Sequence, residues 1–295
     1  MSEKEFAKTR WGVERRLEFI EFRLYWEGGV NRSDIVSTFG VSVPQASKDL
    51  TLYQERAPQN AIYDKSAKRY IAGPDFEPLF DQVDADSYLE RLRVKAEGLV
   101  EPGSSWIGSA PDTDVAVTPH RDVGAEVLRS VLMAIQTKRS VEVLYQSMNE
   151  TRPEAEWRRI SPHALGDDGF RWHARAFCHI DGRFKDFLLP RILDARTLEG
   201  PGAPGSEDAL WQTSLELSIG PHPDLKPGQK AAVEKDYGMI DGVLKISVRR
   251  AMLFYVLKKL GLLSDAHKAN PHTQHIVDLH RDRTVSEMSR QGLSI

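Results

Sequence analysis

The sequence contains a single cysteine, no long hydrophobic run and no excess of positive charge. Cys178 stands alone, so an internal disulfide is excluded and a reducing compartment is indicated. No stretch approaches the roughly 20 apolar residues that a membrane helix needs, and no apolar run follows a basic start. We therefore expect a cytoplasmic protein without a membrane partner. The formal net charge is -3, so any DNA-binding surface must come from local separation of charge.

Patterns typical of catalysis and of metal binding are also lacking. His173 has no serine, cysteine or carboxylate partner at a telling spacing. His272, His275 and His280 lie close together in the sequence, but structural zinc sites normally take four ligands from regularly spaced cysteine and histidine. We predict no catalytic residue, no metal and no cofactor, and we expect that the protein is not an enzyme.

The residues that are present describe an ordinary globular chain. With 295 residues, 40% of them apolar, it is long enough for two or three domains that each bury a core. The order of the predicted elements indicates an α+β multidomain fold. Near the N-terminus we predict a helix from Trp11, a short helix capped by Asn31 or Ser33, and a third helix from Ser42. Gly40 supplies the turn before the third helix, which completes a helix-turn-helix.

The third helix separates into two faces. Ala46, Leu50 and Tyr53 can anchor it, while hydrogen-bonding side chains of the kind that read base edges in a major groove stay outside. We predict that these readers are Ser42, Gln45, Ser47, Lys48 and Thr51. A hairpin over residues 61–71 follows as a wing, and its cations would contact DNA phosphates: Lys65, Lys68 and Arg69. The alternative is a packing or dimerisation module with solvated lysines.

Three short antiparallel strands are predicted between Arg158 and Ile192, with turns at residues 167–169 and 181–182. Along residues 170–178 alternate side chains share a face, so one face is apolar and packs while the other carries cations and an imidazole. The candidate ligand residues are Tyr145, Ser147, Arg159, His163, His173, Arg175, Lys185 and Arg191. Arginine grips phosphate through two bonds and aromatic residues stack bases, so we expect an anionic nucleotide or oligonucleotide as ligand. The alternative is that these cations pair with Asp167, Asp181, Asp186 or Asp194 and hold the sheet together.

Other segments complete the organisation. The acidic stretch over residues 73–115 is expected to be a solvated connector, and Thr118 to cap a helix that runs to Lys138. After a run of glycine and proline at residues 200–205, the pattern predicts a small α+β domain in the order β-α-β-α. Its elements are expected at residues 213–219, 227–237, 242–248 and 250–260.

The central motifs resemble the WYL domain of bacterial transcriptional regulators. They are Val141-Glu142-Val143-Leu144-Tyr145, residues 159–165, the triplet Trp172-His173-Ala174, and Phe187-Leu188-Leu189-Pro190-Arg191-Ile192. His173 and Ala174 stand where the family usually has tyrosine and leucine. Over nearly the whole chain, the order of parts most resembles repressors found beside anti-phage defence operons of the BREX and CBASS type. The resemblance implies an Sm-like β-barrel and a C-terminal extension that helps dimerisation, with Arg249 and Arg250 bordering the ligand site.

This reading divides the chain into four parts. They are a winged helix-turn-helix DNA-binding domain at 1–75, a helical linker at 76–137, a WYL ligand-sensing domain at 138–200, and a C-terminal extension and dimerisation domain at 207–295. Together they suggest a homodimeric repressor of a phage-defence operon, which binds an inverted repeat in double-stranded DNA and is released by its ligand. Two alternatives use the same modules: a nucleic-acid-processing enzyme, and an adaptor in a defence complex.

Overall fold

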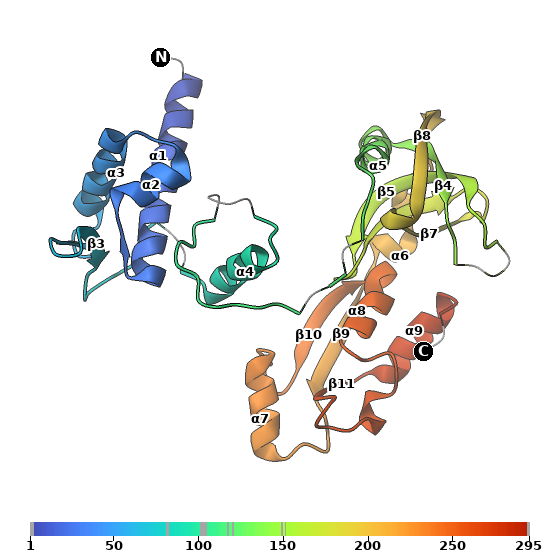
Figure 1. Cartoon of the computed structure of the whole chain (residues 1–295). Helices are drawn as coiled ribbons and strands as arrows, with labels where there is room; N and C mark the ends of the chain where they lie inside the picture. Colours follow the sequence, from blue (N-terminus) through green and yellow to red (C-terminus); the bar gives the residue numbers. More distant parts are fainter. Residues whose placement is uncertain are drawn as a thin grey trace. The chain divides into compact units, whose positions relative to one another are not determined.

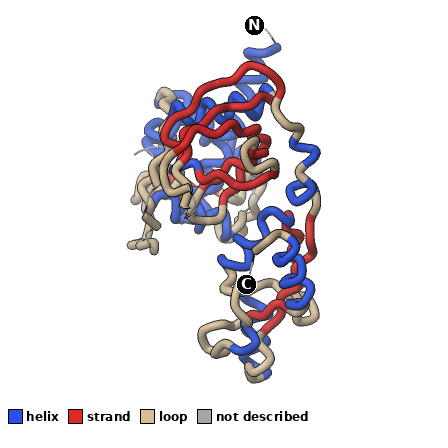
Figure 2. The backbone as a smooth tube through the Cα atoms, turned by 90° about the vertical axis from the view of Figure 1, so that its right-hand side faces the viewer, coloured by secondary structure: helices blue, strands red, loops and turns tan. Residues whose placement is uncertain are grey.

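The computed structural model describes residues 3–80, 83–100, 105–116, 118–119, 121–148, 150 and 152–293. By its internal contacts the chain divides into two compact units, Met1–Thr118 and Pro119–Ile295. Figure 1 labels most of their helices and strands, and Figure 2 shows the backbone with helices in blue and strands in red. Within the described part of the chain, no helix is long and apolar enough to cross a lipid bilayer.

The first unit has the order of elements that the sequence predicted. Its helices are α1 (Glu3–Glu27), α2 (Arg32–Phe39), α3 (Val43–Arg56) and, after the wing, α4 (Ala85–Ala96). Its strands are β1 (Gly29–Val30), β2 (Ala61–Asp64) and β3 (Arg69–Ala72), arranged as β1-β3-β2 with antiparallel pairing. The winged helix-turn-helix is therefore confirmed, although α1 begins well before Trp11.

Local interactions explain where the helices of this motif begin and end. Asn31 accepts a hydrogen bond from the Asp34 amide at 3.0 Å, and the Asp34 carboxylate accepts one from the Asn31 amide, so a capping box opens α2. Gly40 ends that helix in the left-handed region, at φ 64°, where a side chain would be strained. Ser42 accepts from the Gln45 amide at 3.3 Å and caps α3 as expected.

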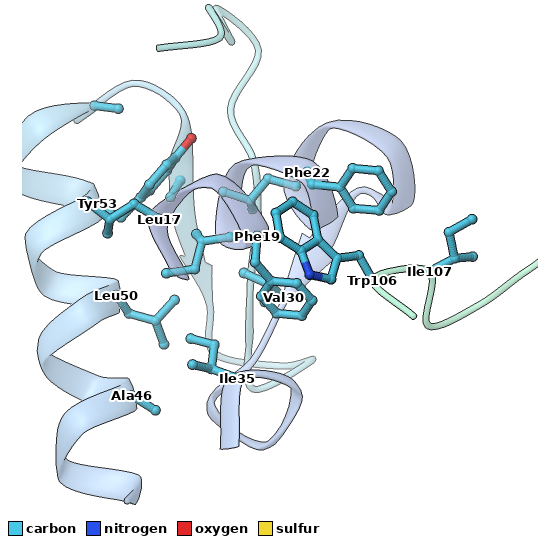
Figure 3. Packing of buried hydrophobic residues seen from close by; sticks show 14 of the residues in the cluster. Leu17, Phe19, Phe22, Val30, Ile35, Ala46, Leu50, Tyr53, Trp106 and Ile107 are labelled. Carbon is cyan, nitrogen blue, oxygen red and sulfur yellow. The ribbon is translucent and has the colours of Figure 1, made fainter. Parts of the chain in front are cut away.

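The core of the first unit lies between its helices. Ala46, Leu50 and Tyr53 of α3 pack in one buried cluster with Leu17 of α1 and Ile35 of α2 (Figure 3). All five side chains are at most 1% exposed. The predicted anchoring face of α3 is therefore confirmed, and its opposite side is left for other contacts.

Residues beyond the wing belong to the same core. The ring of Trp106 meets that of Phe19 edge to face, at a centroid distance of 5.9 Å (Figure 3). The buried Glu21 carboxylate accepts hydrogen bonds from the amides of Leu79 and Phe80, at 2.9 and 2.7 Å. The stretch expected to be a solvated connector thus packs on the DNA-binding motif, because it supplies apolar side chains and amides that the motif buries.

The second unit opens with α5 (Ala125–Thr137) and a five-stranded antiparallel sheet. Its strands are β4 (Arg139–Tyr145), β5 (Glu156–Asp167), β6 (Trp172–Cys178), β7 (Arg183–Leu188) and β8 (Ile192–Pro201), arranged as β7-β6-β5-β4-β8. Helix α5 begins after Gly124 rather than at Thr118, because glycine is unfavourable inside a helix and takes the N-cap position here. Among the described strands no pairing joins β7 to β8, so the sheet is open and the expected barrel is not closed. The 3-10 turn η1 (Leu189–Arg191) carries the chain between these two edges instead.

Alternation along β6 follows the predicted pattern. Ala174, Ala176 and Cys178 are fully buried and pack with Phe187 beneath the sheet. Trp172, which was expected on the same face, is 52% exposed because it pairs with Asp167 at the very end of the strand. The apolar face of the sheet is therefore confirmed except at this last position.

The C-terminal part of the second unit is a small α+β module with an antiparallel sheet in the order β10-β9-β11. Its main elements are β9 (Ser214–Pro221), α7 (Pro227–Asp236), β10 (Leu244–Arg249), α8 (Leu253–Lys259), β11 (Ile276–Asp278) and α9 (Arg281–Arg290). The short elements η2 (Gly205–Glu207), α6 (Ala209–Gln212), η3 (Arg250–Met252) and η4 (Ala266–Lys268) connect or precede them. The predicted β-α-β-α order is present, and β11 and α9 extend it.

Candidate DNA-reading surface and ligand face

The side of α3 that faces away from the core carries the predicted readers. Ser42, Lys48 and Thr51 are exposed, and Gln45 and Ser47 are half-buried. The hydroxyls of Ser47 and Thr51 donate to carbonyls of their own helix one turn back, both at 3.0 Å. Their oxygen atoms can still accept a hydrogen bond from outside. The helix thus presents donors and acceptors on one surface.

Gln45 is held by a network that the sequence did not reveal. Its side-chain nitrogen Nε2 donates to Asp49 Oδ1 at 2.9 Å. Asp49 is 1% exposed and is gripped by Arg16 of α1, whose Nε and Nη2 lie 2.6 and 3.2 Å from its two carboxylate oxygens. Because Asp49 accepts only, the contact also fixes which end of the Gln45 amide points inward. The amide of Gln45 is therefore orientated before any DNA arrives.

The three cations predicted on the wing lie in two different environments. Lys65 and Lys68 are exposed in the β2–β3 turn, which the Asp64 carboxylate shapes by accepting from the amides of the following residues. Arg69 instead packs over Gly29, where any side chain would collide with the guanidinium, and its Nε is buried without a hydrogen-bond partner among the described residues. Two of the three cations are thus free to meet phosphate, whereas Arg69 lies against the unit's own backbone.

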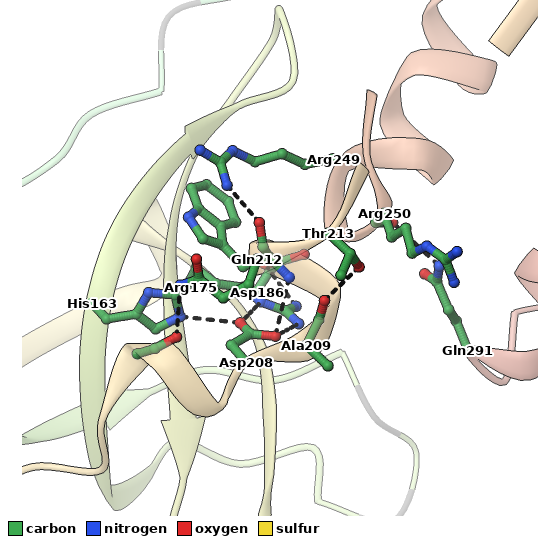
Figure 4. Close-up of polar contacts among 12 residues, drawn as sticks. His163, Arg175, Asp186, Asp208, Ala209, Gln212, Thr213, Arg249, Arg250 and Gln291 are labelled. Atoms are coloured by element: carbon green, nitrogen blue, oxygen red, sulfur yellow. Dashed lines mark hydrogen bonds and ion pairs between the residues drawn. The ribbon is translucent and has the colours of Figure 1, made fainter. Parts of the chain in front are cut away.

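In the second unit, three predicted ligand residues share one face of the sheet. His163 comes from β5, and His173 and Arg175 from β6, where they are 3% and 5% exposed. This face is not open, because side chains from the C-terminal part cover it. The ring of Tyr255 on α8 lies 4.7 Å from that of His173. Asp208, which caps α6, accepts hydrogen bonds from His163 and Arg175 (Figure 4).

Asp208 fills the position where an external anion was expected. It accepts from Arg175 through Nε and Nη2 at 2.7 and 3.1 Å, and from His163 Nε2 at 3.0 Å (Figure 4). Arg175 also donates to Asp186 at 3.2 Å, and Tyr255 donates to the same carboxylate at 2.9 Å. Burial opposes the charge of Asp208, but the hydrogen bonds from His163 and Arg175 outweigh it, and its pKa falls well below the usual range. The alternative of internal pairing thus holds for Arg175.

A second carboxylate neutralises the other end of this face. Asp168 Oδ2 accepts from His173 and from Arg171 Nε, both at 3.0 Å, and Oδ1 accepts from the Phe170 amide at 2.8 Å. Burial would raise the pKa of Asp168, but the Phe170 amide, His173 and Arg171 together lower it to about 2. The imidazole of His173 is therefore orientated by a carboxylate that remains charged.

The remaining predicted ligand residues lie elsewhere. Tyr145 packs in the apolar core against Phe187, and Lys185 donates to Asp181 at 2.9 Å, the main cause that lowers the pKa of Asp181 to about 2. Arg159 is exposed; burial and then its charge lower the pKa of the neighbouring His179. Ser147 lies just after β4 and Arg191 lies in η1, and both side chains are half-buried. The predicted set thus does not form one pocket.

The roles of several residues in this arrangement were not predicted from the sequence. Asp208 could have been found as a helix cap, because its carboxylate accepts from the Trp211 amide at 3.3 Å, but nothing local pointed to Arg175. Arg249 and Arg250, expected at the border of the ligand site, bind within the C-terminal part: Arg249 donates to the Trp211 carbonyl and Arg250 to Glu287 (Figure 4 shows both arginines). Residues 272–280, where three histidines lie close together in the sequence, form a turn and β11.

Comparisons with known families match three parts of the chain. Residues 12–94 match the winged helix-turn-helix domain of the BrxR transcriptional regulator, residues 126–197 the WYL domain, and residues 214–284 the C-terminal dimerization domain of the BrxR transcriptional regulator. The matched ranges include the winged helix-turn-helix, all but the end of the five-stranded sheet, and the C-terminal sheet. They confirm that the resemblance seen in the motifs extends to all three parts.

Curated relatives are similar over almost their full length. The DNA-binding transcriptional repressor CapW of Stenotrophomonas maltophilia is 43% identical over 273 residues, covering 92% of this chain and 90% of that protein. The CapW repressors of Escherichia coli (strain KTE188) and Pseudomonas aeruginosa are each 39% identical, over 91% and 93% of this chain and 89% and 91% of their own.

Among solved structures, proteasome accessory factor B/C (PafBC) of Arthrobacter aurescens aligns at a TM-score of 0.31 and 16% identity, and this chain spans 46% of it. That likeness is too weak to bear on function. The curated relatives are regulators rather than enzymes, which confirms the expectation of a non-enzymatic protein. The chain therefore belongs to the CapW family of DNA-binding transcriptional repressors, with a BrxR-type winged helix, a WYL domain and a C-terminal dimerization domain.

Proposed function

We propose that this repressor binds, as a homodimer, an inverted repeat in double-stranded DNA that controls a phage-defence operon. The observation that carries the proposal is the outer surface of α3, where the candidate readers stand on the side opposite the anchored face. They are Ser42, Gln45, Ser47, Lys48 and Thr51. Side chains of this kind pair with base edges in a major groove, which admits one α-helix.

Reading and anchoring fall to different residues in this proposal. Gln45 reads, since a glutamine amide can accept from and donate to adenine, and its amide is already held by Asp49. Lys65 and Lys68 anchor, because they are exposed on the wing and can meet phosphate without distinguishing bases. Arg69 stabilises the wing against Gly29 and joins the phosphate contact only if it swings away.

The inverted repeat follows from symmetry. A two-fold dimer presents two copies of α3, and these fit two half-sites about 34 Å apart, one turn of DNA, or a multiple of that distance. The match of residues 214–284 to a dimerization domain supports the dimer. A footprint on the DNA upstream of the protein's own gene should show two protected half-sites at that spacing, bound by two chains. One protected half-site bound by one chain would contradict the proposal.

Regulation is proposed to act through the second unit. An anionic nucleotide or oligonucleotide binds the second unit and lowers the affinity for DNA. His163, His173 and Arg175 supply cationic and hydrogen-bonding groups, but Asp208 and Asp168 already occupy them, so a phosphate bound there has to replace a carboxylate. A ligand can release DNA only through a difference between its affinities for free and DNA-bound protein. Equal ligand affinity for the two forms would exclude this regulation.

A further inference from the structure

Several cationic side chains gather beside the neutralised face rather than on it. The β5–β6 turn, the start of the second unit and α8 surround a cavity of about 230 Å³. We call it the basic pocket; its lining residues are Arg121, Asp168, Phe170, Arg171, Tyr255, Lys258 and Lys259. It lies at the edge of the sheet face, since Asp168 and Tyr255 both also contact His173.

The charge of the basic pocket is strongly unbalanced. Four cationic side chains line it against the single carboxylate of Asp168. Both oxygens of that carboxylate already accept hydrogen bonds, from His173, Arg171 and two backbone amides. In the described part of the chain, neither Arg121, Lys258 nor Lys259 makes an ion pair. On the sheet face, Arg175 is instead held by Asp208 and Asp186.

The shape of the pocket brings one of these lysines close to the turn. Gly169 adopts φ 85°, and a Cβ built on it would lie 3.1 Å from Lys259 Nζ. Because Gly169 has no side chain, the turn can adopt this φ value and the ammonium group of Lys259 can approach it closely. Arg171 uses Nε to bind Asp168, and its terminal nitrogens have no hydrogen-bond partner in the described structure.

An aromatic ring stands at the rim. Phe170 is 56% exposed, an unusual position for a phenylalanine, and makes no ring contact within the described residues. Tyr255 forms the inner wall but has its hydroxyl committed to Asp186. Cations that can hold phosphate beside a free aromatic face form the combination that binds a phosphate ester carrying a planar base.

We propose that the basic pocket binds the phosphate of a nucleotide or of an oligonucleotide end, with Arg121, Lys258 and Lys259 on the phosphate and Phe170 stacked on the base. The site rests on the proposed function for its regulatory meaning, but binding itself is independent of DNA. It requires no displacement of Asp208 from Arg175, which the sheet face would require. It also lies between the WYL sheet and α8 of the dimerization domain, so that an occupant contacts both.

The test is calorimetric titration of the full chain with inorganic phosphate, deoxyadenosine monophosphate and a 5′-phosphorylated deoxyadenosine dinucleotide. The variant Lys258→Ala/Lys259→Ala should bind both nucleotides at least tenfold more weakly. Its control, Lys230→Ala/Lys235→Ala, removes two cations from α7, outside the pocket, and should bind like the wild type. The variant Phe170→Ala should weaken nucleotide binding by roughly fivefold or more and leave phosphate binding unchanged.

Each outcome decides the question. Failure of the wild type to bind either nucleotide at millimolar concentration, or an equal loss in the two double variants, overturns the proposal. Tighter binding of the dinucleotide than of the mononucleotide identifies an oligonucleotide end as the source, and equal binding identifies a free nucleotide. Operator binding is measured on the same preparations. If the operator binds but the pocket variants behave as the control, only this inference fails; if nucleotide binding depends on Lys258 and Lys259 while no operator is bound, only the proposed function fails.

Discussion

Removing the Asp208 carboxylate tests how the two parts of the second unit are held together. In Asp208→Ala, Arg175 loses its bidentate partner and keeps only Asp186, while His163 loses its hydrogen bond. Removing one partner of a buried ion pair costs about 3 to 5 kcal/mol, and the second carboxylate places this case near the lower value. Loss of the α6 cap adds roughly 1 kcal/mol. We therefore expect a loss of about 4 kcal/mol in the free energy of unfolding of the second unit.

The assay is urea unfolding followed by tryptophan fluorescence, with Glu207→Ala as the matched control. Glu207 is the exposed neighbour of Asp208, and its removal should change stability by less than about 0.5 kcal/mol. The double variant Asp208→Ala/Arg175→Met should recover part of the loss, because no buried charge is then left unpaired. A loss below about 1 kcal/mol, or no recovery in the double variant, would refute the assignment of Asp208 as the internal counter-ion.

The stabilisation by Asp208 depends on pH. The pKa of Asp208 is lower in the folded protein than in the unfolded chain, so its contribution is complete above the unfolded value of about 4 and disappears as the pH falls through the folded value. The stability difference between wild type and Asp208→Ala should therefore be constant at neutral pH and shrink below about pH 4. A difference that grew on acidification would show that the sign is wrong.

Three further predictions concern DNA. Gln45→Ala should reduce discrimination at the contacted base by roughly 1–3 kcal/mol, measured by anisotropy on single-base operator variants; unchanged discrimination would remove Gln45 as a reader. Lys68→Ala should weaken specific and random duplex alike and reduce the salt slope by about 1, and an effect confined to the operator would show that it reads bases. Asp49→Ala should lower stability by roughly 3 kcal/mol, because Arg16 is left unpaired, and should reduce discrimination at the base affected by Gln45→Ala. Added to Gln45→Ala, it should reduce discrimination no further, and an additive loss would separate the two residues.

Local signals were sufficient for the DNA-binding motif. The caps at Asn31 and Ser42, the glycine at Gly40 and the apolar spacing of α3 each act within a few residues, so the sequence contains them in readable form. Strand alternation likewise predicted that Ala174 and Ala176 are buried. Such features depend on neighbours along the chain, which is why they were predicted correctly.

The long-range pairings could not be predicted from the sequence. Asp208 lies 33 residues from Arg175, and Asp49 is likewise 33 residues from Arg16, so no spacing rule connects them. The sequence therefore could not show that the chain's own carboxylate, Asp208, occupies the anion site expected at Arg175. Trp106 stands in a stretch without apolar periodicity, and only the folded core shows that it completes the first unit.

The proposed function depends on recognition of a specific operator by α3. Fluorescence anisotropy of the full chain with the DNA upstream of its own gene, in the presence of excess random duplex at physiological salt, tests it most directly. We expect binding that resists the competitor by a factor of roughly 1,000 or more and is lost selectively in Gln45→Ala. Equal affinity for the upstream DNA and for random duplex would contradict it.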